Sequence, residues 1–406
     1  MSVDYASKIV YSAVSSHLIK YNFKHKDYIF NDCEKFEIYE DKTFRIILRK
    51  DIFYYDGTNV TAKDYVSYIK FLMTQKCLIG MFLSDIDDVK YIDKYKFDIK
   101  LKCKNKNFKY ILSFYQLSPV KSFNITCGPY YISNNSRYKI HLKRNQYYRN
   151  KCHFVCNNDL TFSVSKNFKK DVKYFLNDEL DITNNTMFPY NKIKNFNELN
   201  IYPSFIFMCL EFSNKLLRDD FLKLREAIYF GINREEIVRR LFGYVSSALD
   251  FNLNMNDCSN YFFHRICNFI NINLTMGYDL FYPNEIVAKI IQSQLSEINI
   301  NIMLVKNKYA EKNQNDINLK LIYPLYINNM AFYNSPYFYL LSKVTKNEEF
   351  LSNYDLIKND KLTKKQIINI FNKTFPIIPI IKMNSIYLAK DNVKNFNFLE
   401  CDFSVL

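Results

Sequence analysis

Glycine is scarce in this sequence. Its 406 residues include only six glycines, where average usage would give about 7% of the chain. No two of them lie closer together than Gly231 and Gly243. The dinucleotide fingerprint G-x-G-x-x-G, the P-loop G-x-x-x-x-G-K and the nucleophile elbow G-x-S-x-G all need more closely spaced glycines. None of the three motifs can be written in this chain, so each is excluded.

Paired metal ligands are also missing. The five histidines include no two that lie four positions apart, which removes the zinc motif H-E-x-x-H. The ten cysteines form no C-x-x-C, and the only close pair, Cys152 and Cys156, encloses a single histidine, His153. We therefore predict no metal site and no cofactor, and we expect buried, reduced thiols. A Ser/His/Asp or Cys/His site assembled across the fold stays open, but no local sequence supports one, and we predict no enzymatic activity.

Long apolar runs are absent as well. No window approaches the roughly 20 apolar residues of a membrane span. The best candidate for a secretory leader, residues 9–19, is interrupted by Ser12, Ser15, Ser16 and His17. The sequence as written therefore predicts no membrane span and no signal peptide.

Positive charge is in excess: 56 Lys and Arg against 41 Asp and Glu give a net charge of +15. The lysines are scattered singly or in pairs, as in residues 102–109 and 166–173, and form no long basic run. This pattern favours a solvated surface, with a nucleic-acid groove or an envelope or partner surface as the alternatives. We predict no nucleic-acid partner.

Apolar spacing predicts a mixture of helices and strands. Apolar residues at helical spacing from Ile9 to Leu18 predict a helix within residues 1–36, placed over 5–20. Thr61 with Asp64 three positions later marks the start of another helix. Strands are predicted over residues 36–48 with a turn at 40–42, 89–101 as a hairpin, 130–142, 160–164, 205–210, 300–305, 317–322, 377–381 and 386–388. Further helices are predicted over residues 108–114, 168–180, 217–241, 283–298 and 362–371.

Three segments carry longer patterns. Residues 48–64 read L-R-K-D-I-F-Y-Y-D-G-T-N-V-T-A-K-D, which is a strand, a D-G turn and a helix start. Residues 127–132 read C-G-P-Y-Y-I and are followed by R-N-Q-Y-Y at 144–148, and residues 224–238 read L-R-E-A-I-Y-F-G-I-N-R-E-E-I-V. These segments resemble the family 5 solute-binding proteins of ABC importers, the oligopeptide-, dipeptide- and nickel-binding group.

Four further segments resemble the same family, in the same order. Residues 177–182 are similar to its G-E-x-D-I segment, with Asp178 at the glycine position, and residues 288–302 to one of its helix–strand units. Residues 375–380 and 387–396 are similar to its closing P-i-i-P-l and V-k-g-f segments. The resemblance covers most of the chain and is that of a divergent member, which lacks a signal peptide and the family's first strand.

The resemblance implies an α/β, two-lobed, periplasmic-binding-protein-like fold of type II, in the large peptide-binding subclass, which closes on its ligand by a hinge motion. The hinge is crossed twice, near residues 204–212 and 374–381. The implied boundaries are residues 1–37, 121–205 and 376–406 for lobe I, 38–120 for an extra subdomain of lobe I, and 206–375 for lobe II. The extra subdomain is expected to be reduced, because the segment between Lys70 and Val89 is short.

The family's ligand-binding strand is matched by residues 316–326. The aspartate that pairs with a peptide's amino terminus in peptide-binding members falls on Leu325, and the usual tryptophan falls on Ile322. A buried ammonium without a carboxylate partner is costly, so the resemblance implies no recognition of a free amino terminus there. Main-chain groups of Leu321, Ile322 and Tyr323 are expected to pair with an extended ligand as an added strand, which Pro324 limits because it lacks a donor.

Aromatic and charged candidates complete the expected ligand site. Tyr54, Tyr323 and Tyr326 are candidates for its walls, because the chain has 34 tyrosines and no tryptophan. Lys382 is the candidate partner of a ligand carboxylate, with a solvated lysine as the alternative. The full set of candidate ligand-binding residues is Leu321, Ile322, Tyr323, Leu325, Tyr326, Lys382 and Tyr54.

The resemblance predicts a non-catalytic protein that traps a peptide or similar small polar ligand between two lobes for uptake. Its expected partners are that ligand and a membrane ABC permease, and we expect a monomer outside the cytoplasm, on the cell-envelope side. The alternative is a divergent cytosolic relative that serves as a ligand sensor or protein-partner module with no transport role.

Overall fold

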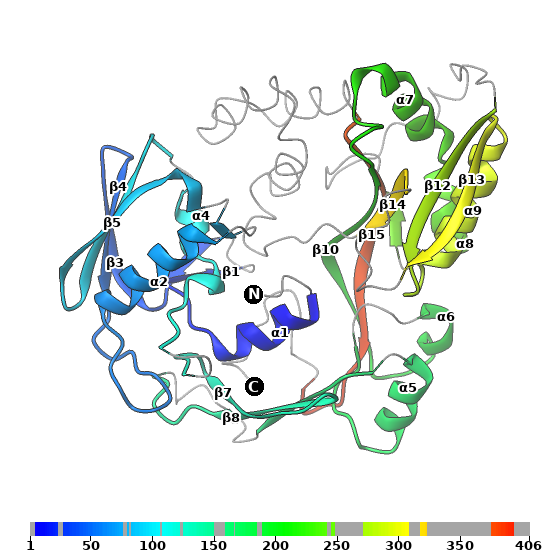
Figure 1. Ribbon diagram of the computed structural model, residues 1–406. Helices are drawn as coiled ribbons and strands as arrows, with labels where there is room; N and C mark the ends of the chain where they lie inside the picture. The colour runs from blue at the N-terminus through cyan, green and yellow to red at the C-terminus, as the bar shows by residue number, and fades with distance from the viewer. Residues whose placement is uncertain are drawn as a thin grey trace.

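The computed structural model describes residues 5–22, 27–75, 79–80, 83–105, 108–121, 125–149, 159–165, 167–184, 189–241, 245–247, 271–307, 317–322 and 375–393. These residues form an α/β structure with sheets of two, three, four and six strands. Figure 1 shows the four-stranded sheet with α2 on one side of the molecule and the six-stranded sheet with α7, α8 and α9 on the other.

The first helix is shorter than its apolar spacing predicts. The prediction of a helix over residues 5–20 was wrong beyond Val14, because α1 spans Tyr5–Val14. The backbone N–H of Ser16 donates to Ser118 Oγ at 3.0 Å and not to a helical carbonyl. Leu18, the last position of the supposed stripe, packs in a different core cluster from that of Val14. The chain continues as a two-stranded hairpin, β1 (Ile19–Asn22) with β2 (Asp27–Phe30).

The four-stranded antiparallel sheet has the order β3-β4-β6-β5. Its hairpin turn was predicted correctly, and Glu40 and Asp41 both adopt positive φ there, as a tight strand-to-strand turn requires. The predicted start of α2 is also confirmed, since Asp64 Oδ2 accepts hydrogen bonds from the Thr61 N–H at 2.8 Å and from its hydroxyl at 2.6 Å. The elements are β3 (Cys33–Tyr39), β4 (Thr43–Leu48), α2 (Ala62–Thr74), β5 (Ile86–Asp93) and β6 (Lys96–Leu101).

These elements enclose the first core cluster, which consists of buried apolar residues between Leu18 and Cys127 together with Phe207, Cys209 and Ile377 from later in the chain. The alternating burial along β4 supplies one wall, and the inner face of α2 supplies the other. The next helix, α4 (Phe108–Leu112), closes the cluster.

A three-stranded sheet, β7-β8-β9, follows and packs against α1. Gly128 precedes β7, and its N–H donates to the Val14 carbonyl at 3.1 Å. A Cβ atom at Gly128 would lie 2.2 Å from the Val14 carbonyl carbon and 2.5 Å from the Ser15 nitrogen. The close approach of two backbones therefore requires glycine at this position. The strands are β7 (Tyr130–Asn135), β8 (Lys139–Arg144) and β9 (Leu160–Ser163).

The six-stranded mixed sheet has the order β11-β15-β10-β14-β12-β13. Parallel strands β12 and β13 are joined through α9, as a crossover requires. The predicted closing strands form one continuous strand, β15. The elements are α5 (Phe168–Leu176), α6 (Tyr190–Ile193), β10 (Leu199–Phe212), α7 (Leu222–Gly231), α8 (Arg234–Arg240), β11 (Val245–Ser247), β12 (Ile272–Asp279), α9 (Asn284–Ser296), β13 (Ile300–Asn307), β14 (Leu319–Ile322) and β15 (Ile377–Leu388).

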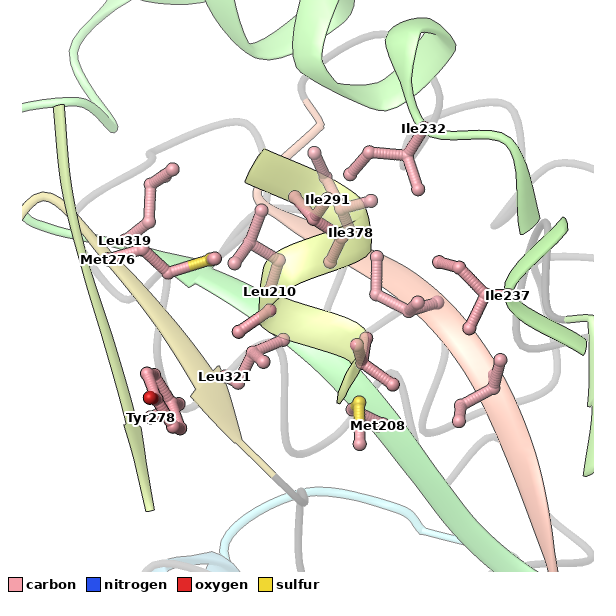
Figure 2. Close-up of a cluster of buried hydrophobic side chains, with 14 of the residues drawn as sticks. Met208, Leu210, Ile232, Ile237, Met276, Tyr278, Ile291, Leu319, Leu321 and Ile378 are labelled. Atoms are coloured by element: carbon pink, nitrogen blue, oxygen red, sulfur yellow. The ribbon is translucent and has the colours of Figure 1, made fainter. Parts of the chain in front are cut away.

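Helices cover one face of this sheet and form the second core cluster with it. Figure 2 shows Leu210, Leu321 and Ile378 from three neighbouring strands pointing toward Ile291 of α9 and Ile237 of α8. The second cluster thus takes alternate side chains from β10, β12, β13 and β14, whereas β15 contributes the adjacent pair Ile380 and Ile381 as well.

Strands β10 and β15 pair antiparallel over nearly their full lengths, from Leu199 opposite Leu388 to Glu211 opposite Ile377. One end of β15 contributes Tyr387 to the third core cluster, which also holds α1 and β7 side chains. The other end contributes to the first and second clusters. The same two strands, which lie side by side in Figure 1, therefore contribute to all three clusters.

Cysteine placement follows the expected pattern in the described part of the chain. Cys33, Cys127 and Cys209 are buried free thiols, and Cys103 is exposed. Burial raises the pKa of Cys127 to about 12, so this thiol stays protonated. Cys152, His153 and Cys156 lie outside the described residues, as does the helix predicted over 362–371.

The close approach at Gly128 gives a first prediction. Gly128→Ala should destabilise the protein by about 1–3 kcal/mol, because the new methyl group meets backbone atoms that cannot move aside. Urea unfolding monitored by circular dichroism measures this loss. The control is Gly231→Ala, where the nearest atom to a new Cβ is the end of the Ile298 side chain, at 2.8 Å. Equal unfolding midpoints for Gly128→Ala and wild type would contradict the role of this contact.

A buried carboxylate in α5 gives a second prediction. Asp171 is buried, and its removal from water raises its pKa. Such a group stabilises the fold fully only below about pH 4 and loses this contribution as pH rises through its folded pKa. Asp171→Asn should therefore gain stability relative to wild type between about pH 4 and pH 7. Melting temperatures of both proteins across this range test it, and parallel curves would show that burial of Asp171 has no electrostatic cost.

Candidate functional site

The second face of the six-stranded sheet is turned toward the first core cluster. Residues along β10 alternate between the clusters. Phe207 and Cys209 belong to the first cluster, and Met208 and Leu210 belong to the second. On β14, Ile322 packs against the first cluster, while its neighbour belongs to the second. The sheet thus separates the helix-covered core from a face that looks toward the N-terminal part of the chain. We call this second face the inner face.

Strand register shows which predicted residues share the inner face. Cys209 lies opposite Ile322 of β14 and opposite Pro379 of β15, and Phe207 lies opposite Lys382. Directly paired residues point to the same face of a sheet. Ile322 and Lys382 are therefore brought to one face, with Phe207 and Cys209 between them.

Lys382 is the cationic residue of this arrangement. Its side chain is partly buried, and burial lowers its pKa below the usual value for lysine. Among the residues that the structure describes, no carboxylate forms an ion pair with it. The residues directly paired with it are Phe207 of β10 and Ser246 of β11, neither of which is charged.

Among the described residues, β14 has a strand partner on only one side beyond Lys320. β12 pairs with β14 only at Met276–Leu319 and Gly277–Lys320, while β10 pairs with it as far as Ile322. Within the described chain, the β12 side of β14 therefore has no strand partner at its last two residues. Unpaired backbone groups at such an edge can accept an added strand.

The other sequence candidates have different positions. The Leu321 side chain belongs to the second core cluster, so only its backbone is available to a ligand. Tyr54 is 1% exposed inside the first cluster, where burial raises its pKa, and it acts as a core residue and not as the wall of an exposed site. Tyr323, Leu325 and Tyr326 lie outside the described residues.

The sequence analysis did not identify Phe207 and Cys209 as members of this face. Both lie in a continuous apolar strand, 205–210, where hydrophobicity is the same on both sides. Only the register with β15 and the two core clusters distinguish the faces. No spacing rule applied to this strand alone could have done so.

A buried charge network includes Tyr65 of the first core cluster. Asp32 Oδ1 accepts hydrogen bonds from Ser16 Oγ at 2.6 Å and from Arg149 Nη1 at 2.7 Å, and Asp32 Oδ2 accepts one from the Tyr65 hydroxyl at 2.7 Å. Burial alone would lower the pKa of Arg149, but the charge of Asp32, its hydrogen bond and the nearby Tyr148 and Asp51 together offset this and raise the pKa. The network joins the loop after α1, helix α2 and the segment after β8. Both carboxylate oxygens of Asp32 accept hydrogen bonds within it, which indicates a structural role.

A family model described as "Bacterial extracellular solute-binding proteins, family 5 Middle" matches residues 33–260, more than half of the sequence. The chain belongs to this family. The predicted family and the α/β, periplasmic-binding-protein-like fold are both confirmed.

Solved structures of family 5 proteins match nearly the whole chain. NikA from Staphylococcus aureus, in complex with Ni(L-His)2, aligns with a TM-score of 0.79 and 17% identity over 97% of this chain and 93% of NikA. The murein tripeptide binding protein MppA of Escherichia coli aligns with a TM-score of 0.77 and 16% identity over 100% and 94%. OppA of Haemophilus influenzae, in complex with RPPGFSPFR, gives 0.75 and 16% over 95% and 90%. No curated protein matches the chain by sequence.

Membership fixes the general function. Family 5 proteins are the non-catalytic solute-binding proteins of ABC importers, so the prediction that this chain is not an enzyme is confirmed. The family is extracellular, and no helix among the described residues is both long and apolar enough to cross a membrane.

The buried ion pair between Arg149 and Asp32 gives a third prediction. Arg149→Met should destabilise the fold by about 3–5 kcal/mol, because it leaves the Asp32 carboxylate buried without a counter-charge. The matched control is Arg49→Met, which breaks the exposed Arg49–Asp51 pair and should cost less than about 1 kcal/mol. Chemical denaturation of the three proteins measures both costs. Similar losses in the two variants would refute the special status of the buried pair.

Proposed function

We propose that this chain binds a peptide or a similar small polar solute between its two lobes and presents it to an ABC permease at the membrane. The observation that supports this most directly is the edge of β14 that, beyond Lys320, has no strand partner among the described residues. An extended ligand can add to that edge through main-chain hydrogen bonds, which tolerate many side chains. The inner-face residues Ile322 and Lys382 lie beside it.

The lobes are those that the sequence implies. Lobe I comprises residues 1–37, 121–205 and 376–406 with the extra subdomain 38–120, and lobe II comprises 206–375. The register of β10 with β15 supports the boundary at 205, because it shifts between Pro203 and Ile206. An irregularity of this kind bends a strand and interrupts its ladder.

Closure is proposed to occur at these two strands. They alone are long enough among the described strands to run from the third core cluster to the second, and both are interrupted in the middle of their shared ladder. Bending there would change the angle between the lobes without breaking either core. The solute stabilises the closed state to the extent that it contacts both lobes.

The proposed site does not hold a free amino terminus through a carboxylate. Leu325 stands where the peptide-binding members have their aspartate. We therefore propose that blocking a peptide's amino group leaves its affinity for this protein nearly unchanged. Solutes other than peptides, including metal complexes, remain within the class that family 5 proteins bind.

A thermal-shift screen tests this function. The purified chain is screened against short peptides with free or acetylated amino termini, free amino acids and nickel–histidine. A ligand at about 100 times its Kd should stabilise the protein by ~2.7 kcal/mol, since it binds only the folded state. Peptides should raise the melting temperature, equally in both amino-terminal forms, and reduce the radius of gyration in solution scattering.

Two results would contradict the proposal. A strong preference for free amino termini would show that a carboxylate elsewhere replaces the missing aspartate. Absence of any shift would favour the alternative, a family relative that acts as a partner-binding module without transport.

A further inference from the structure

Lys382 occupies the middle of the interrupted part of the β10–β15 ladder. The register shifts between Pro203 and Ile206 on one side, and between Met208 and Cys209 on the other. Only a short regular stretch, in which Phe207 lies opposite Lys382, remains between the two shifts. Lys382 therefore lies at the position on β15 where we propose that the hinge bends.

The second shift has a clear structural consequence. Met208 pairs with Ile381 and Cys209 with Pro379, so Ile380 is an extra residue on β15. Ile380 and Ile381 both pack in the second core cluster although they are adjacent. The bulge thus returns the following residue, Lys382, to the inner face beside Phe207.

No partner in the described structure accounts for the charge of Lys382. The two residues directly opposite Lys382 are Phe207 of β10 and Ser246 of β11, and neither is charged. Cys209, Ile322 and Asn384 lie on the same face and are uncharged as well. The carboxylate of Glu211 lies on the same face but four residues along β10 from Phe207, about 13 Å at the rise of a strand. Glu211 is itself opposite Lys320.

A partly buried ammonium without a counter-charge is unfavourable for the free protein. Loss of hydration raises the free energy of the charged side chain, and only a hydrogen-bonding or oppositely charged group can offset this. Burial lowers the pKa of Lys382, which reports this cost. A solvated lysine, the alternative reading, would have no such cost, because its charge would remain in water.

We infer that Lys382 binds an anionic group of the solute, so that the ligands of this protein carry a carboxylate directed at the hinge. This inference rests on the proposed function and adds the charge of the ligand to it. A carboxylate that enters beside Lys382 forms a charge-assisted hydrogen bond in a partly dry site. The bound carboxylate also offsets the free-energy cost of the unpaired Lys382 ammonium at the hinge. The charge of the ligand is thereby coupled to closure of the lobes.

The test compares acetylated peptides that carry a free carboxyl terminus with the same peptides amidated at that terminus. Affinities are measured by calorimetry for wild type, Lys382→Met, Lys382→Arg and Lys320→Met. Wild type should bind the acids about 10- to 100-fold more tightly than the amides. Lys382→Met should lose this preference, and Lys382→Arg should retain part of it. Lys320→Met is the matched control, a lysine of the same face with Glu211 opposite, and should behave as wild type.

Folding of the key variant does not limit the experiment. Lys382→Met replaces a partly buried charge with an apolar chain of similar length, so its melting temperature without ligand should equal or exceed that of wild type. Equal affinity for acids and amides in wild type, or an unchanged preference in Lys382→Met, would overturn the inference and leave the proposed function standing.

Failure of the proposed function gives a different result. If no peptide of either form binds, the proteins are screened by thermal shift against citrate, phosphate and sulfate. Stabilisation by one of these anions that is lost in Lys382→Met would support the anion site without peptide binding. No Lys382-dependent shift with any anion would overturn the inference as well.

Discussion

The antiparallel pairing of β10 with β15 is the constraint on which the rest of the molecule depends. It joins a strand from the middle of the chain, Leu199–Phe212, to one near its end, Ile377–Leu388. Side chains of the pair enter all three core clusters, so no cluster is complete without it. The ladder therefore holds together segments that are distant in sequence. Its two irregularities provide the places where that connection can bend.

Two basic residues that are removed from water differ in their partners. Arg149 lies 2.7 Å from Asp32, and the pair also receives hydrogen bonds from Ser16 and Tyr65. Such a network of a buried ion pair and hydrogen bonds specifies how its segments fit together. Lys382 forms no ion pair among the described residues, and we propose an anionic group of the solute as its partner.

Local signals in the sequence predicted the local elements well. The turn at Glu40 and Asp41 and the start of α2 at Thr61 both follow from the chemistry of adjacent residues. Asp178, at the family's glycine position, adopts φ of 60°. The first helix was predicted too long, because Leu18 continues its apolar spacing but packs in another cluster. Spacing alone cannot reveal which core a side chain enters.

The sequence by itself determined the family, the mixture of helices and strands and most of their positions, because caps, turns and alternation act over a few residues. It also indicated Ile322 and Lys382 as candidate ligand-binding residues. The tertiary structure decided which candidates meet, because only the register of β10 with β14 and β15 places these two on one face and sends Leu321 and Tyr54 into cores. Register depends on pairing between segments more than a hundred residues apart, and no local pattern encodes it.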